Sequence, residues 1–297
     1  MTTHHIPFPR RLRYGMETAL VYLLYGFFRI LPMPAASAAG GALGRFAGKI
    51  FPSTKTAYAN LDAIMPEKTQ GEKDAIVSGM WDNLGRVMGE YAHLHHIMSR
   101  VELIGDAHLQ KVKQQGGPAI FFAAHIANWE ICSVAVQTRG VDIHPVYRRP
   151  NNPWVENLLR AARRTGSTGL IPKGSAGARE MLSVLKRGGT LGIMMDQKLN
   201  EGMAVPFFGR DAMTAPAIAT FALKFKCPVH PVRIERLGGC HFRVTVLPAI
   251  DTQATGDKQA DILRILTTIN TCFEDWIRAR PEQWLWSHRR WPNIGGK

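Results

Sequence analysis

The feature that most constrains the fold is an alternation of short apolar segments and longer amphipathic segments that begins near residue 118. The apolar segments have the length of buried strands, and the amphipathic segments have the length of helices. Strands are expected at 118–124, 143–148, 190–195, 228–234 and 241–247, and helices at 128–138, 153–165, 175–187, 215–226 and 258–279. This alternation predicts an α/β fold with a mostly parallel central sheet flanked by helices.

One of these apolar segments ends abruptly in a histidine. The run from Ala119 to Ala124 is followed by His125, and Glu130 lies five residues further on. His125 is therefore expected at the carboxyl end of a strand, where open α/β sheets place their ligand crevice. Asn128 is expected to begin the next helix, and Glu130 could reach back to the imidazole from its first turn. Such a pair suits a general base for acyl transfer, although both residues could simply favour a helix N-terminus.

A second apolar strand ends in a carboxylate in the same way. Asp196 follows Met194 and Met195, so it is expected at the same sheet edge as His125, where it could orient an arginine or another hydrogen bond. An ordinary turn aspartate is the alternative interpretation.

Two pairs of arginines are candidates for contacts with an anion in this crevice. Arg148 and Arg149 end the strand near 143–148, and Arg163 and Arg164 end the following helix. A guanidinium suits a phosphate or the developing oxyanion of an acyl transfer. The alternative is a solvated helix end, where cations are favourable in any case.

Two aromatic segments follow. Phe207 and Phe208 lie in an expected loop at 205–210, which could line an acyl-chain tunnel or belong to the core. Near the C-terminus, Trp284, Trp286 and Trp291 are interleaved with arginines. This pattern suits lipid headgroups, or a terminal segment that packs back on the domain.

Residues 1–50 are expected to form an N-terminal membrane-associated helical segment, and residues 51–297 a single α/β domain. Arg10, Arg11 and Arg13 precede an apolar stretch, and only about a dozen residues between Glu17 and Arg29 are uncharged. A helix of that size spans roughly 17 Å, short of the ~30 Å hydrocarbon core. We therefore expect a helix that lies in the membrane interface, assisted by small residues at 35–47. A buried helix of the domain is the alternative.

The charge balance indicates an anionic partner. Lys and Arg number 37 against 23 Asp and Glu, which gives a formal net charge of +14. This excess attracts nucleic acid, anionic membranes, phosphorylated lipids or an acidic carrier protein. No nucleic-acid-binding motif accompanies the charge, and the four cysteines form no Cys-x-x-Cys pair, so neither nucleic acid nor a metal is expected.

Taken together, these segments resemble the late acyltransferases of lipid A biosynthesis, the lauroyl/myristoyl acyltransferase family. The resemblance covers nearly the whole chain and depends on the order and spacing of its motifs. The motifs are the basic, apolar N-terminus, 125–130, Tyr147-Arg148 with Asn152-Pro153, Met195-Asp196-Gln197, 205–209 and 284–291.

The resemblance implies a glycerolipid-acyltransferase-like fold at the cytoplasmic face of the cell inner membrane, and a role in lipopolysaccharide biosynthesis. It implies an acyl carrier protein thioester as the donor and a hydroxyl of a phosphorylated lipid A precursor as the acceptor, without an acyl-enzyme or a cofactor. Acyl transfer to another amphiphile, such as a phosphatidylinositol mannoside, an ornithine lipid or a glycerophosphate, is the alternative.

The resemblance also assigns roles to residues. His125 would deprotonate the acceptor hydroxyl, and Glu130 would hold His125. Arg163 would contact the oxyanion or a phosphate and be positioned by Asp196. Asn128, Arg148, Arg149, Arg164, Phe207 and Phe208 complete the expected substrate-binding residues.

Overall fold

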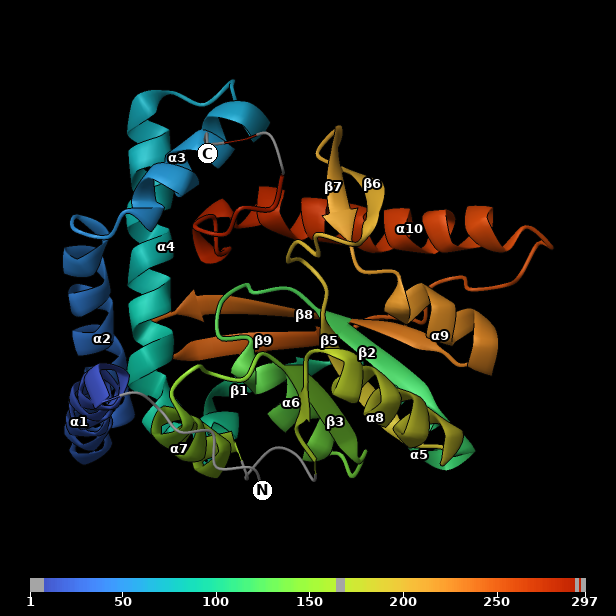
Figure 1. Ribbon diagram of the computed structural model, residues 1–297, viewed down its shortest axis with the longest axis horizontal. Helices are drawn as coiled ribbons and strands as arrows, with labels where there is room; N and C mark the ends of the chain where they lie inside the picture. The colour runs from blue at the N-terminus through green and yellow to red at the C-terminus, as the bar shows by residue number, and fades with distance from the viewer. Residues whose placement is uncertain (1–7, 164–168, 292–293, 295–297) are drawn as a thin grey trace.

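The computed structural model describes residues 8–163, 169–291 and 294, and its centre is a twisted sheet (Figure 1). Within the described residues seven strands pair in the order β1-β9-β8-β2-β5-β3-β4. The strands are β1 Val101–Ile104, β2 Ala119–Ala123, β3 Ile143–Tyr147, β4 Ile171–Pro172, β5 Thr190–Met194, β8 Val229–Gly238 and β9 His241–Val246. Neighbours are parallel except β8 and β9, which confirms the predicted, mostly parallel sheet.

Strand β2 lies near the middle of the sheet and is buried along its whole length. Successive side chains of a strand point to opposite faces, and the two phenylalanines of β2 identify what covers each face. Phe121 stacks on His230, whose ring lies 5.9 Å from that of His108 in α5 Asp106–Gln115. Phe122 packs edge-on against Phe273 in α10 Lys258–Ala279. The sheet is therefore covered on both faces, as its apolar strands require.

Four further helices connect or cover the strands. These are α6 Glu130–Gln137, α7 Pro153–Arg163, α8 Ser175–Lys186 and α9 Ala217–Phe225. They match the predicted helices to within about two residues at each end. Helix α6 packs on β3, β8 and β9, whereas α8 packs on β4, β5 and α9.

The segment expected as a loop at 205–210 is instead part of a hairpin. Strands β6 Met203–Phe207 and β7 Arg210–Thr214 pair in antiparallel fashion, and β6 packs against α10. The turn between them contains Phe208 and Gly209, both with positive φ. The expectation was wrong because a two-residue turn with a non-glycine residue at positive φ is uncommon and gives a weak signal.

The N-terminal part consists of helices that pack at one end of the sheet (Figure 1). They are α1 Phe8–Ile30, α2 Met33–Gly48, α3 Ser53–Ile64 and α4 Gln70–Glu90, followed by 3₁₀ turns η1 Tyr91–His93 and η2 Ile97–Arg100. A capping box of Thr69 and Glu72 begins α4. The 3₁₀ turn η3 Pro281–Gln283 packs against α4 from the C-terminal side.

The glycines of α2 are buried, and several of them face α4. A Cβ atom at Gly40 would lie 2.3 Å from the carbonyl oxygen of Gly85, and one at Gly44 would lie 2.1 Å from that of Trp81. The two helices are therefore in backbone contact, which only glycine permits. These glycines are thus used for close helix packing, whereas the expectation that residues 35–47 assist membrane contact stays a prediction for the exposed face of α2.

Helix α1 carries a row of exposed apolar side chains. Leu12, Met16, Leu20, Leu23, Phe27 and Ile30 are all at least 45% exposed. Its other side packs on α7, η1 and α2. In the part of the chain that the structure describes, no helix combines the length and apolar character needed to span a bilayer.

Candidate active site

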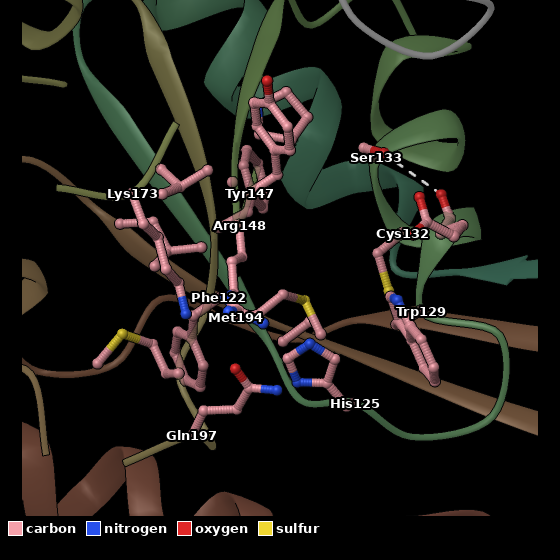
Figure 2. A pocket seen from close by; sticks show the side chains of 18 of the residues that line it. Phe122, His125, Trp129, Cys132, Ser133, Tyr147, Arg148, Lys173, Met194 and Gln197 are labelled. Carbon is pink, nitrogen blue, oxygen red and sulfur yellow. Dashed lines mark hydrogen bonds between the residues drawn. The ribbon is translucent and has the colours of Figure 1, made fainter. Parts of the chain in front are cut away.

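A cavity of about 730 Å³ lies at the carboxyl edge of the sheet. Among the described residues, the charged or titratable ones that line it are His125, Glu130, Cys132, Tyr147, Arg148, Arg163, Lys173, Lys198 and His288, together with many apolar side chains. Its position agrees with the expected crevice beyond the ends of parallel strands. Figure 2 shows His125, Arg148, Lys173 and Gln197 pointing toward the same hollow.

The register of the sheet brings His125 and Asp196 together. Ala123 of β2 is opposite Met194 of β5, so the residues two positions beyond each strand end lie at the same height. Nδ1 of His125 lies 2.7 Å from Oδ1 of Asp196, and the backbone N–H of His125 donates to Oδ2 at 3.0 Å. The indole N–H of Trp284 donates to Oδ2 at 2.8 Å.

These contacts keep Asp196 ionised although it is buried. Burial alone raises the pKa of this carboxyl, but the His125 ring and the hydrogen bonds from His125 and Trp284 hold the pKa well below its usual value. An ionised carboxylate only accepts hydrogen bonds, so Nδ1 of His125 must carry the proton. Whenever the ring is neutral, its Nε2 atom then has a free lone pair, and this atom has no hydrogen-bond partner among the described residues.

The corner between β2 and α6 is held by segments distant in sequence. Ile126 bridges to Trp284, and the N–H of Ala127 donates to the carbonyl of Gln283 at 3.0 Å. Ala127 has a φ of +48°, an uncommon conformation for a residue with a side chain. Its carbonyl accepts from Asn83 of α4 at 3.0 Å, which further fixes the corner.

Asn128 lies behind this corner and not on the cavity. It is fully buried, its Nδ2 donates to Glu90 at 2.8 Å, and its Oδ1 accepts from the N–H of Glu130 at 3.3 Å. Asn128 thus lies one residue before Trp129, the N-cap of α6, and contacts the first turn of that helix, but it makes no contact with the cavity where substrate was predicted. Glu90 also accepts from Ser37 at 2.7 Å and pairs with Arg236, so Asn128 belongs to a buried polar network that supports the site.

Glu130 is paired with Arg163 and not with His125. The guanidinium makes a two-point contact with the carboxylate, at 2.8 Å from Nε and 2.6 Å from Nη2. Arg163 also lies over the rings of Tyr91 and Tyr147. Although burial lowers the pKa of Arg163, Glu130 raises it above its ordinary value, so the side chain is a fixed cation in the cavity wall.

Two predicted partnerships were therefore wrong. We expected Glu130 to hold His125 and Asp196 to position Arg163. In the structure Asp196 contacts His125, and Glu130 contacts Arg163. Glu130 is near His125 in sequence, but the first turn of α6 directs it toward the end of α7. Asp196 is distant in sequence, but β5 is the neighbour of β2.

The remaining predicted arginines have different positions. Arg148 lines the cavity, whereas Arg149 is 58% exposed and pairs with Glu156 at 3.1 Å. Of these two predicted substrate-binding residues, only Arg148 is therefore placed to contact a ligand in the cavity. Arg164 lies outside the described residues.

Phe207 and Phe208 are buried away from the cavity, which contradicts their predicted contact with an acyl chain. Phe207 stacks on Trp291 with ring centroids 5.3 Å apart, and Phe208 packs beside both. Trp284, Trp286 and Trp291 are each at most 2% exposed, so the C-terminal segment packs back on the domain. Aromatic composition alone does not distinguish a core cluster from a tunnel wall.

Several site residues were not identified from the sequence. Trp284 braces Asp196 across 88 positions, and no local signal indicates that contact. Lys173 follows the two-residue strand β4, which is too short to recognise. His288 lines the cavity, and burial lowers its pKa to about 4, so its ring is neutral at physiological pH.

Comparisons with known proteins identify the family of this chain. The profile of the family described as bacterial lipid A biosynthesis acyltransferase matches residues 7–293. A lipid A biosynthesis acyltransferase of Haemophilus influenzae is 23% identical over 283 residues, covering 92% of this chain and 86% of the relative. The lipid A biosynthesis myristoyltransferase of Escherichia coli is 24% identical, covering 82% of this chain and 77% of the relative. A solved structure of a 1-acyl-sn-glycerophosphate acyltransferase, PlsC, from Thermotoga maritima is a remote match, with 12% identity and a TM-score of 0.37 over 88% of this chain and 98% of that one.

An α/β chain with an imidazole and a fixed cation in a deep cavity fits the acyltransferase class. The match across almost the whole length shows that this chain belongs to the bacterial lipid A biosynthesis acyltransferase family. Its activity is acyl transfer in lipid A biosynthesis.

The Glu130–Arg163 pair generates a stability prediction. Because each side chain is largely buried, removing one leaves the other without its partner. We expect Glu130→Gln and Arg163→Met each to lower the free energy of unfolding by about 2 kcal/mol, and the double variant to lose less than the sum. Chemical denaturation of the three variants measures this coupling, and strictly additive losses would contradict the pairing.

Proposed function

We propose that this protein transfers a fatty acyl chain from an acyl carrier protein thioester to a hydroxyl of a phosphorylated lipid A precursor. His125 acts as the general base and Asp196 holds it. The observation that carries this proposal is the contact between His125 and the ionised Asp196, which leaves Nε2 free beside the cavity.

Proton transfer to His125 and acyl transfer to the acceptor would be coupled. Nε2 of His125 takes the proton of the acceptor hydroxyl as its oxygen attacks the thioester carbonyl. A C–O bond forms, the C–S bond breaks, and the proton passes from the imidazolium to the departing thiolate. Asp196 stabilises the imidazolium throughout, because it remains an anion in contact with Nδ1.

The side chains near the base favour direct transfer over an acyl-enzyme. Cys132 lines the cavity, but burial raises the pKa of its thiol to about 12, so it is not a thiolate at neutral pH. The Ser133 hydroxyl donates to the backbone carbonyl of Glu130 at 3.3 Å and has no imidazole partner. Neither residue has the activation that a covalent nucleophile needs.

The cavity wall supplies the other requirements of the reaction. Arg163, fixed by Glu130, presents a permanent positive charge to a developing oxyanion or to a phosphate. Val136, Ile143, Met181, Ile193 and Ile218 give the wall an apolar part that suits an acyl chain. An acidic carrier and a phosphorylated acceptor both suit a chain with a net charge of +14.

The lipid acceptor further requires contact with a membrane, which we place at the cytoplasmic face of the inner membrane. The exposed apolar row of α1 and the arginines in its first two turns, Arg10, Arg11 and Arg13, support this placement. An amphipathic helix of this kind lies in the interface and is attracted by anionic headgroups.

Substitution of the base tests the mechanism. His125→Ala is expected to lower kcat at least a hundredfold, roughly the contribution of a positioned base, and Asp196→Asn to lower it by a comparable factor because the ring loses its fixed tautomer. The assay incubates purified protein with a panel of acyl carrier protein thioesters and the disaccharide precursor, and mass spectrometry measures the product.

Cys132→Ala serves as the matched control, because it alters the cavity wall without touching the base. It should keep transfer within a fewfold of the parent. Parent-like rates for His125→Ala would refute the mechanism, and absence of any acylated product from the parent protein would refute the proposed substrates.

Substitutions on α1 test the membrane contact. Leu23 and Ile30 are 72% and 80% exposed, and burial of one such side chain contributes roughly 1.5–3 kcal/mol. Leu23→Asp and Ile30→Asp should each reduce partition to vesicles containing anionic lipid at least tenfold. Leu263→Asp on the surface of α10 is the control, and co-flotation gives the readout. Equal flotation of the α1 and α10 variants would remove α1 as the contact.

A further inference from the structure

We propose that Arg148, Lys173 and Lys198 form a binding site for a phosphate group of one of the two substrates, at the edge of the cavity that contains His125. The inference rests on the proposed function, because it takes the substrates to be phosphate esters. It adds two lysines to the site and assigns them a ligand chemistry.

The topology of the sheet places the three cations together. Arg148 directly follows β3, Lys173 directly follows β4, and Lys198 lies four residues beyond β5. The neighbouring strands β5, β3 and β4 are parallel to one another, so the residues that follow them lie at the same edge of the sheet. The N–H of Lys173 donates to the carbonyl of Tyr147 at 2.8 Å, which fixes the loop of Lys173 beside that of Arg148.

All three side chains line the cavity (Figure 2 labels Arg148 and Lys173). None of the three forms an ion pair or a side-chain hydrogen bond with another described residue. Among the described residues of the cavity wall, Glu130 is the only acidic side chain, and it is already paired with Arg163. Asp196 behind the wall is occupied by His125 and Trp284.

Within the part of the chain that the structure describes, these three cations therefore have no carboxylate paired with them. Burial lowers the pKa of Lys173, and Arg148 acts in the same direction, while Asp196 opposes them. By contrast, Arg149 and Arg160 a few residues away share the carboxylate of Glu156. A bound phosphate would provide these three cations with a negatively charged partner and with charge-assisted hydrogen bonds.

Two groups carry this chemistry. The first is the phosphate ester of the acceptor sugar, and the second is the phosphate that links pantetheine to the carrier protein. Both are anions held at some distance from the reacting atoms. Contact with either would position a substrate without entering the chemical step.

Binding measurements with small probes distinguish the two sources. We would titrate the full-length parent protein in detergent at low salt with glucosamine 1-phosphate and glucosamine, and with 4′-phosphopantetheine and pantetheine. The parent is expected to bind one phosphorylated probe at least about tenfold more tightly than its phosphate-free counterpart, the usual scale for a charge-assisted hydrogen bond. The pair that shows the difference identifies the substrate.

Variants then test which residues are responsible. Lys173→Met and Lys198→Met should abolish the preference for phosphate, whereas Lys186→Met should keep it. Lys186 is an exposed residue at the end of α8 that does not line the cavity, so its substitution removes the same charge elsewhere. Binding needs no turnover, so His125→Ala should also keep the preference while losing transfer.

The inference is overturned if the parent shows no preference for either phosphorylated probe, or if Lys173→Met and Lys198→Met retain it. Failure of acyl transfer in the parent with an intact phosphate preference would instead refute the proposed reaction and leave this site standing.

Discussion

The structure of this site depends on one buried carboxylate. Asp196 accepts hydrogen bonds from the backbone and ring of His125 and from the indole of Trp284. These contacts join the end of β5, the corner after β2 and the C-terminal segment. An isolated buried carboxylate would be unstable as an anion, and these partners lower its pKa so that it stays charged. In return, the charged carboxylate fixes which nitrogen of His125 carries the proton.

The cavity thus separates two tasks between two carboxylates. Asp196 controls the imidazole, while Glu130 fixes the guanidinium of Arg163. Each carboxylate is paired with its own base, so Glu130 does not compete for His125 and Asp196 does not compete for Arg163. Behind them, the buried network of Glu90, Asn128 and Arg236 anchors the corner that carries His125. Such support keeps catalytic groups in place without contact with the substrate.

The sequence was most informative where the chain is locally regular. The alternation after residue 118 predicted the sheet and its main helices, and the two apolar strands predicted that His125 and Asp196 lie at one edge. The sequence did not predict which carboxylate contacts His125, because that depends on the order of the strands in the sheet. Strand β5 pairs with β2 although the two are far apart in the sequence. Lys173 was missed because the strand before it has only two residues. The contact of Trp284 with Asp196 was missed because the two residues are 88 positions apart in the sequence.

The protonation state of the His125 ring tests the central claim most directly. Nitrogen-15 NMR of histidine-labelled protein, with His125 assigned by comparison with His125→Ala, reports which ring nitrogen carries hydrogen. At a pH where the ring is neutral, we predict a protonated Nδ1 and an unprotonated Nε2, and loss of this single form in Asp196→Asn. A ring protonated at Nε2 in the parent protein would contradict the account, because the base would then have no lone pair to offer the acceptor hydroxyl.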